Sequence, residues 1–203
     1  MQIDVIVTFI FSVFFLTISP GPDILYVFIK SISEGKSEGV KLSFGLTSGL
    51  FFHTLLVVFG ISAIINSNEL FSSIIKYFGF SFFIFLFFIT LFKKNNEYQT
   101  KKSIRSSFFT GLMMNILNPK VSLFFIALFP GFIFHDSMKI SLQFLVLGLI
   151  FWIIATLIFV TISLFSGNIK GYVDGFINNK FFKYLQSVIY LLIALVILLL
   201  VVL

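Results

Sequence analysis

Two charged residues, Asp23 and Lys120, stand well inside long apolar stretches of the sequence. Charges inside a bilayer are costly, so each one within an apolar span is a candidate functional group. The carboxylate of Asp23 could bind a substrate ammonium, exchange a proton or cap a helix that begins beside it. The ammonium of Lys120 could neutralise Asp23, contribute to an anion site, or lie along its helix and bond a backbone carbonyl. The two charges predict a polar site within apolar surroundings.

The first charge ends the motif Ser19-Pro20-Gly21-Pro22-Asp23. Each proline removes a backbone donor and clashes with the preceding turn, and Gly21 permits dihedral angles that other residues avoid. We therefore expect the helix to kink or unwind here, which leaves carbonyl and N–H groups in need of partners. Backbone of this kind is tolerated at membrane depth only where it is buried in protein or lines a wet cavity.

The second charge ends the motif Asn115-Ile-Leu-Asn118-Pro119-Lys120. Asn115 and Asn118 are three residues apart and share one face of a helix. Pro119 predicts a second helix break directly after them. Two amides and an ammonium could together bind a carboxylate.

A third group of small and polar residues lies between the two motifs. Gly45, Gly49 and His53 recur every four residues, which puts them on one helix face. Glycines at this spacing favour close helix packing, and the same face would allow a homodimer. His53 could titrate near neutral pH and take part in transport, or it could be a hydrogen-bonded packing residue.

The composition determines which elements can carry these residues. Of the 203 residues, 59% are hydrophobic and only 11% are charged, whereas a soluble domain has about 25% charged residues. Ordinary cytosolic globules, disordered proteins and nucleic-acid-binding domains are therefore disfavoured. Without cysteine, disulfides and thiolate metal sites are excluded as well. A multi-pass membrane protein remains, and we expect neither a metal nor another cofactor.

Six apolar segments are long enough to cross a bilayer as helices. They cover residues 3–29, 42–65, 70–92, 108–134, 140–165 and 181–203. We therefore predict an all-α integral membrane protein with six transmembrane helices in a single transmembrane domain, residues 1–203.

The order of the segments suggests an internal repeat. Three segments precede a loop at residues 93–107 and three follow it, which gives halves of about 1–92 and 108–203. An odd number of spans in each half forces the two halves into opposite orientations, as in inverted-repeat transporters with broken helices. The proline break lies in the first helix of each predicted half.

The distribution of charge predicts the orientation. The net charge is +6, and 11 of the 14 lysines and arginines fall in the three loops between segments one and two, three and four, and five and six, or in the first turn after them. Cytoplasmic loops carry an excess of basic residues. These three loops are therefore expected in the cytoplasm, and both termini outside it.

Taken together, the two motifs resemble those of the lysine exporter (LysE/RhtB) family of translocators. The resemblance also includes Gly111 and Phe129-Pro130, and it covers about residues 10–135; the last third matches mainly as two hydrophobic spans. It implies a secondary transporter that exports amino acids or related small metabolites across the bacterial inner membrane, driven by the proton gradient. The residues that match the family's signature positions are Pro20, Gly21, Pro22, Asp23, Asn118, Pro119 and Lys120.

One position departs from the family pattern. Leu50 stands where family members often carry an acidic or amide residue, so proton coupling would depend on Asp23, on His53 or on neither. The hypothesis from the sequence is that Asp23 holds the ammonium or the coupling proton, while Asn115, Asn118 and Lys120 face the carboxylate of a zwitterion.

The sequence disfavours three other functions. An exporter of a metal cation or another small solute is disfavoured, because the spans hold too few ligands for a dedicated cation path. An intramembrane enzyme is disfavoured, because His53 has no evident nucleophile or base as a partner. A membrane subunit without a transport role has little reason to carry buried charges beside two helix breaks.

Overall fold

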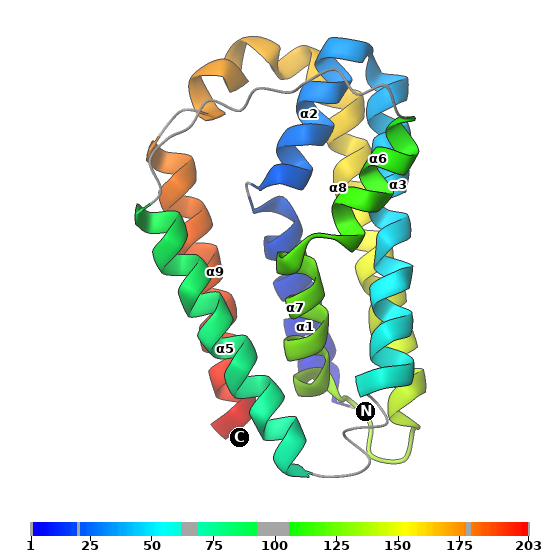
Figure 1. The fold of residues 1–203 in the computed structure, drawn as a ribbon, viewed down its shortest axis with the longest axis vertical. Helices are drawn as coiled ribbons and strands as arrows, with labels where there is room; N and C mark the ends of the chain where they lie inside the picture. Colours follow the sequence, from blue (N-terminus) through cyan, green and yellow to red (C-terminus); the bar gives the residue numbers. More distant parts are fainter. Residues whose placement is uncertain (1, 20, 62–68, 93–105, 178–179, 203) are drawn as a thin grey trace.

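The computed structural model describes residues 2–19, 21–61, 69–92, 106–177 and 180–202 (Figure 1). These residues form helices and contain no strand, which confirms the all-α prediction. Pro20 and residues 93–105 of the expected central loop lie outside the described residues.

The first half of the chain begins with a broken helix. α1 (Ile3–Ile18) and α2 (Pro22–Glu34) are inclined to each other by 53°. α3 (Lys36–Leu56) follows and ends in a π-helical turn, η1 (Val57–Ile61). α5 (Glu69–Phe92) completes this half.

The second half has elements in the same order. α6 (Ser107–Ile116) and α7 (Pro119–Leu128) form another broken pair, bent by 50°, and a 3₁₀ turn, η2 (Phe129–Phe132), extends α7. The long helix α8 (Ile140–Ile177) and then α9 (Lys180–Val202) follow.

The expected loop between the first two segments is almost entirely helical. Only Gly35 separates α2 from α3, and it has a φ of 98° that favours glycine. Lys30 contacts Glu34 at 2.7 Å, and Lys41 contacts Glu38 at 2.6 Å, each within one helical turn. Such pairs support helix where the chain becomes polar, whereas hydropathy marks only the apolar part of a helix.

Length and composition identify the spanning helices. Residues Lys36–Gly60 and Ile140–Ser166 could each cross a membrane, and the two bent pairs raise the total to four. The described apolar parts of α5 and α9, Tyr77–Phe92 and Tyr184–Val196, are shorter. The described helices thus account for two to four spans, and the count of six stays a prediction.

Close packing of α3 on α6 brings the second break to the middle of the molecule. A Cβ added to Gly45 would lie 2.0 Å from the carbonyl oxygen of Phe108, and one added to Gly111 would lie 2.3 Å from that of Leu42. Only glycine allows the two backbones this approach. α5 and α9 pack together on the other side of the molecule (Figure 1).

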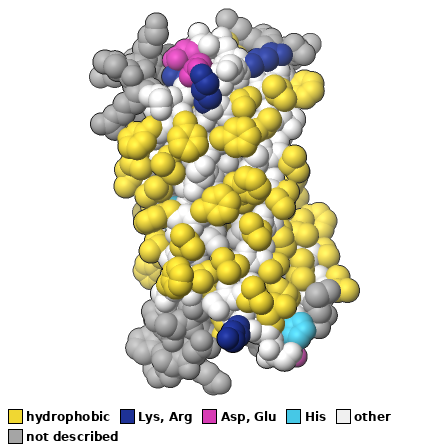
Figure 2. Space-filling view, turned by 90° about the vertical axis from the view of Figure 1, so that its right-hand side faces the viewer, with side chains coloured by type: hydrophobic (Ala, Val, Ile, Leu, Met, Phe, Trp, Pro, Cys, Tyr) yellow, Lys and Arg dark blue, Asp and Glu magenta, His cyan; other side chains and the backbone are white. Residues whose placement is uncertain are grey.

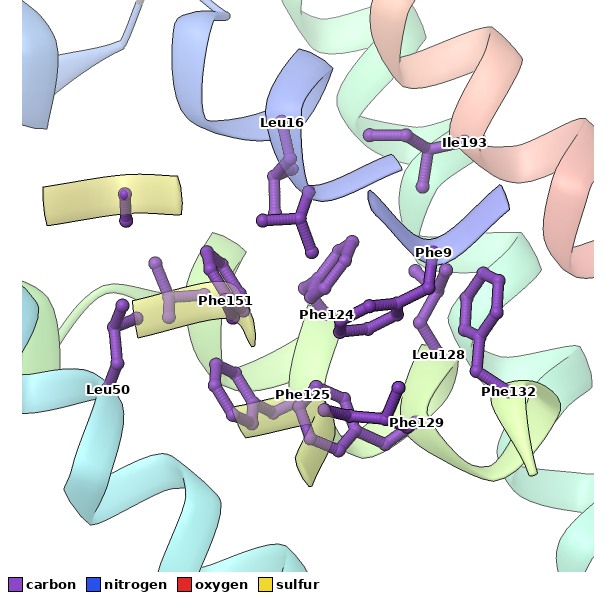
Figure 3. Close-up of a cluster of buried hydrophobic side chains, with 14 of the residues drawn as sticks. Phe9, Leu16, Leu50, Phe124, Phe125, Leu128, Phe129, Phe132, Phe151 and Ile193 are labelled. Carbon is purple, nitrogen blue, oxygen red and sulfur yellow. The ribbon is translucent and has the colours of Figure 1, made fainter. Parts of the chain in front are cut away.

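An aromatic core surrounds α7 (Figure 3). The ring of Phe125 stacks on those of Phe129 and Phe151, with centroids 4.4 Å and 5.2 Å apart. The outer surface has the opposite pattern from a soluble protein: on the face in Figure 2, hydrophobic side chains cover the middle and charged ones lie at the two ends. This is the distribution that a bilayer requires.

The turn between η2 and α8 is organised by one buried side chain, Gln143. Its Oε1 accepts from the N–H groups of Phe134 and His135, at 2.8 Å and 3.0 Å. Its Nε2 donates to the carbonyls of His135 and Met138, at 2.7 Å and 2.8 Å. The carbonyl of Phe134 accepts from the N–H of Gln2, which ties the start of α1 to the turn.

Candidate functional site

The two helix breaks meet, and Asn118 joins them. Asn118 is the N-cap of α7, and its Oδ1 accepts from the N–H of Lys120 at 3.0 Å. Its Nδ2 donates to Oδ2 of Asp23 at 2.7 Å, across 95 residues of sequence. One amide therefore starts α7 and holds the carboxylate at the start of α2.

The first break leaves a carbonyl that a lysine satisfies. In an unbroken helix the carbonyl of Leu16 would accept from the N–H of residue 20, but Pro20 has none. In the structure Nζ of Lys120 donates to this carbonyl at 3.0 Å. The second break thus supplies the donor that the first one lacks.

The second break leaves an equivalent carbonyl, on Asn115. Pro119 stands four residues later and cannot donate to it. The Nε2 atom of His53 lies 3.1 Å from this oxygen, and the N–H of Asn118 donates to it at 3.0 Å. A carbonyl only accepts, so Nε2 of His53 carries a proton. The ring of His53 is buried and lies beside that of Phe125.

A small cavity of about 30 Å³ lies between the breaks. Its lining is mostly apolar, and its polar lining residues are Thr17, Asp23, Asn115 and Lys120. The lining residues are Leu16, Thr17, Gly21, Asp23, Leu50, Asn115, Lys120, Val121, Phe151, Ala155 and Phe159. Three of the apolar lining residues, Leu16, Leu50 and Phe151, are labelled in Figure 3 beside the aromatic core.

Several polar atoms here are unsatisfied. Within the described part of the chain, the buried side-chain oxygens without a hydrogen-bond partner are Ser19 Oγ, Asp23 Oδ1, Asn115 Oδ1 and Thr156 Oγ1. Asp23 and Asn115 line the cavity. A buried acceptor without a donor is costly, and these two oxygens suit a ligand that donates hydrogen bonds.

The glycines of the motifs differ in what they do. Gly49 makes room for Asn115, because an added Cβ would lie 2.5 Å from its Oδ1. Gly45 brings α3 against α6. Gly21 differs from the sequence interpretation: its φ of −155° and ψ of 178° are extended and open to any residue. A Cβ added there would lie 3.7 Å from Nζ of Lys120, an ordinary contact.

Asp23 and Lys120 lie in the same site without forming a direct ion pair. The ion pairs among the described residues join Lys30 to Glu34 and Lys41 to Glu38. Asp23 instead accepts from Asn118, and Lys120 donates to the carbonyl of Leu16. Both charges therefore keep bonding capacity for another group.

One residue beside the site has no counterpart in the sequence motifs. Tyr190 of α9 is buried, and the centre of its ring lies 5.5 Å from Nζ of Lys120. A lysine ammonium at this distance is attracted by the ring face. Nothing in the sequence singles Tyr190 out, because Tyr184 stands in the same apolar segment. In the described ranges, three or more His, Cys, Asp or Glu side chains do not gather as a metal site would need.

Comparisons with known proteins agree with this architecture. The family model for LysE type translocators matches residues 14–201. The chain is 28% identical to the uncharacterized membrane protein YrhP of Bacillus subtilis over 186 residues, which cover 85% of this chain and 87% of the relative. It is 24% identical to the leucine efflux protein of Enterobacter sp. (strain 638) over 182 residues, which cover 85% and 82%.

A membrane protein of Vibrio cholerae is 29% identical over 161 residues, which cover 73% of this chain and 74% of that protein. No solved structure matches the chain. The family match reaches beyond the two motifs and includes the C-terminal third, which the motifs alone left as two apolar segments. The chain therefore belongs to the LysE type translocators, and it is a multi-pass membrane transporter, not an enzyme.

Proposed function

We propose that this protein exports amino acids or closely related small metabolites across the bacterial inner membrane, coupled to the proton gradient. The observation that carries the proposal is the meeting of two broken helices around a cavity that holds a carboxylate, an ammonium and unsatisfied acceptors. A relative named as a leucine efflux protein supports the amino-acid class.

The ammonium end of the substrate belongs at Asp23. Its Oδ1 and that of Asn115 are buried acceptors without partners beside the cavity. An ammonium brings three donors and a positive charge to this place. In this proposal Asn115 faces the ammonium, whereas the sequence hypothesis had it face the carboxylate.

The carboxylate end belongs at Lys120, the ammonium that lines the cavity. Asn118 was expected on the carboxylate as well, but both atoms of its amide are already bonded. Its task in the proposal is to hold Asp23 and to start α7.

The side chain of the substrate would meet apolar residues, because Leu50, Phe151 and Phe159 line the cavity. This lining favours an amino acid with a neutral, apolar side chain. A volume of about 30 Å³ holds little more than water. The described conformation is thus a closed one, and the breaks must separate to admit the substrate.

Proton coupling follows from the chemistry of Asp23. A protonated carboxyl group has no charge with which to hold an ammonium, so proton and substrate would compete for one oxygen pair. Such competition is what proton-driven export requires. His53 is assigned a supporting part, since its Nε2 holds the carbonyl of Asn115.

We also propose six spans arranged as two inverted repeats in one domain. A bent pair, a long helix and a further helix occur twice in the same order. The α2–α3 junction, the start of α6 and the C-terminal end of α8 lie at one end of the molecule, and both termini lie at the other (Figure 1). The bias of basic residues favours the first end as the cytoplasmic one.

The test removes each charge in turn. Cells that lack the protein are complemented with wild type, Asp23→Asn or Lys120→Met and given dipeptides that release single amino acids. We expect wild type to restore efflux of at least one amino acid and each variant to reduce its efflux at least tenfold. Membrane insertion should be unchanged, because each substitution removes a charge from the apolar region.

Matched controls come from the exposed turn that precedes α8. Asp136→Asn and Lys139→Met remove the same two charges from exposed positions, so both should export as wild type does. Normal efflux by Asp23→Asn and Lys120→Met would refute the site. Efflux of no amino acid by the wild type would refute the substrate class.

A further inference from the structure

The ammonium group of Lys120 occupies a site that is formed by two other helices. Its Nζ donates one hydrogen bond to the carbonyl of Leu16 at 3.0 Å and lies 5.5 Å from the centre of the Tyr190 ring. The ring is held in turn, because Gln186 donates to the hydroxyl of Tyr190 at 2.9 Å. A backbone oxygen from α1 and an aromatic face from α9 thus form a cradle for a cation.

The cradle does not depend on the lysine that fills it. Its oxygen is available because Pro20 cannot donate to Leu16, and its aromatic face is fixed within α9 by Gln186. The lysine forms no direct ion pair here, although an ammonium has three donors. Asp23, close by, keeps one oxygen unsatisfied.

We propose that the carbonyl of Leu16 and the ring of Tyr190, next to Asp23, form a binding site for a primary ammonium group, and that Lys120 fills this site only in the closed conformation. When a carboxylate draws Lys120 away, the site receives the ammonium of the transported molecule. This last exchange rests on the proposed function; the existence of the ammonium site does not.

The exchange conserves charge inside the membrane. In the closed state one lysine ammonium accompanies the carboxylate of Asp23. After a zwitterion enters, its carboxylate accompanies Lys120 and its ammonium takes the cradle. While Asp23 stays ionised, the net charge of the site is the same before and after the exchange, so the zwitterion brings no uncompensated charge into it.

The test empties the cradle and offers it a free cation. Lys120→Ala deletes three methylene groups and one ammonium, which n-propylammonium replaces. Binding is measured on the purified protein in detergent by calorimetry and by the shift of the thermal midpoint. We expect Lys120→Ala to bind n-propylammonium, and wild type not to bind it, since its own lysine fills the site.

Three controls separate this site from simple cavity filling. Lys120→Met fills the space without a charge and should not bind. n-Propanol has the same number of heavy atoms as n-propylammonium but no charge, and it should not bind to Lys120→Ala. Adding Tyr190→Leu to Lys120→Ala should weaken binding of n-propylammonium by about two-fold to thirty-fold, the range that a cation–π contact contributes.

A second variant covers poor folding of Lys120→Ala. The chain has no cysteine, so Lys120→Cys gives a single thiol. Aminoethyl methanethiosulfonate transfers its aminoethylthio group to that thiol, releases methanesulfinate and restores an ammonium. We expect this adduct, and not the neutral methylthio adduct, to raise the thermal midpoint, and Tyr190→Leu to reduce the rise.

The proposal is overturned if n-propylammonium binds wild type as well as Lys120→Ala, if n-propanol binds equally, or if the charged and neutral adducts of Lys120→Cys behave alike. These measurements involve no transport. A protein that exports no amino acid could still bind the amine, and an active exporter could fail to bind it. The two failures are therefore distinguishable.

Discussion

At each proline break, a side chain from a distant part of the sequence completes the backbone hydrogen bonding. Pro20 leaves the carbonyl of Leu16 to Lys120, and Pro119 leaves that of Asn115 to His53. The break is stable at membrane depth because no freed carbonyl at these two positions lacks a donor. The residues that bend the helices and those proposed to bind the substrate are consequently part of one network.

Asn118 is the residue that should separate structure from function most clearly. In Asn118→Asp the side chain still accepts from the N–H of Lys120, since aspartate is as good an N-cap as asparagine. It can no longer donate to Asp23 and instead faces it with a second carboxylate. We expect efflux to fall at least tenfold, measured with the dipeptide-loaded cells, while the protein still inserts and folds.

Asn118→Ala serves as the comparison, because it loses both bonds. The missing N-cap should cost about 1 kcal/mol, seen as a lower thermal midpoint than that of the wild type. Equal efflux by Asn118→Asp and wild type would mean that the bond to Asp23 has no part in transport.

The sequence predicted where the site residues lie in the chain but not how they contact one another. Proline, a carboxylate and an ammonium within apolar segments can be recognised from bilayer energetics alone. The bond from Lys120 to Leu16 crosses 104 residues, and local chemistry at neither end indicates it. Tyr190 could not be assigned for the same reason: its role comes entirely from the packing of α9.

At the level of elements, the contact of α3 with α6 sets the position of the second break. Gly45→Ala would put a Cβ 2.0 Å from the carbonyl oxygen of Phe108, a backbone atom that cannot turn aside. We expect a loss of stability of about 3 kcal/mol or more, at the upper end for overpacking. It is measured as the change in the thermal midpoint and in denaturant unfolding in detergent.

Gly60→Ala is the matched control, because a Cβ there meets nothing within 4 Å. It should be neutral or slightly stabilising. Equal stability of Gly45→Ala and wild type would mean that the two helices can separate without penalty, and it would remove the reason for glycine at this position.

Hydropathy predicted the apolar helices well and their ends poorly. The break positions follow from proline, whose effect is local. Helix continues from α2 to α3 through charged residues that pair within single turns, such as Lys30 with Glu34. A polar helix outside the bilayer has no apolar signal, so the expected loop could not be recognised as helix.

For the whole molecule, the closely packed helices suggest which parts move together. α3 contacts α6 through glycines, and Oγ of Ser43 lies 3.0 Å from Oγ of Ser163 in α8. We expect α3, α6 and α8 to remain one rigid scaffold during transport. A disulfide between Ser43→Cys and Ser163→Cys should therefore form on oxidation and leave efflux within about two-fold of the reduced protein.

The absence of native cysteine makes the double variant a clean test. Crosslinking is followed by labelling of the remaining free thiols, and each single variant controls for the oxidant. Loss of efflux on oxidation that a reductant restores would show that α3 and α8 separate in the cycle, and the scaffold would have to be assigned elsewhere.

The turn held by Gln143 has a consequence for where the membrane surface lies. The amide of this glutamine satisfies backbone groups of Phe134, His135 and Met138 from within. These backbone groups do not need hydration, so they do not draw the turn toward water. The exposed charges of Asp136 and Lys139 do need it, and we expect them to set how deep this end of α8 lies in the membrane.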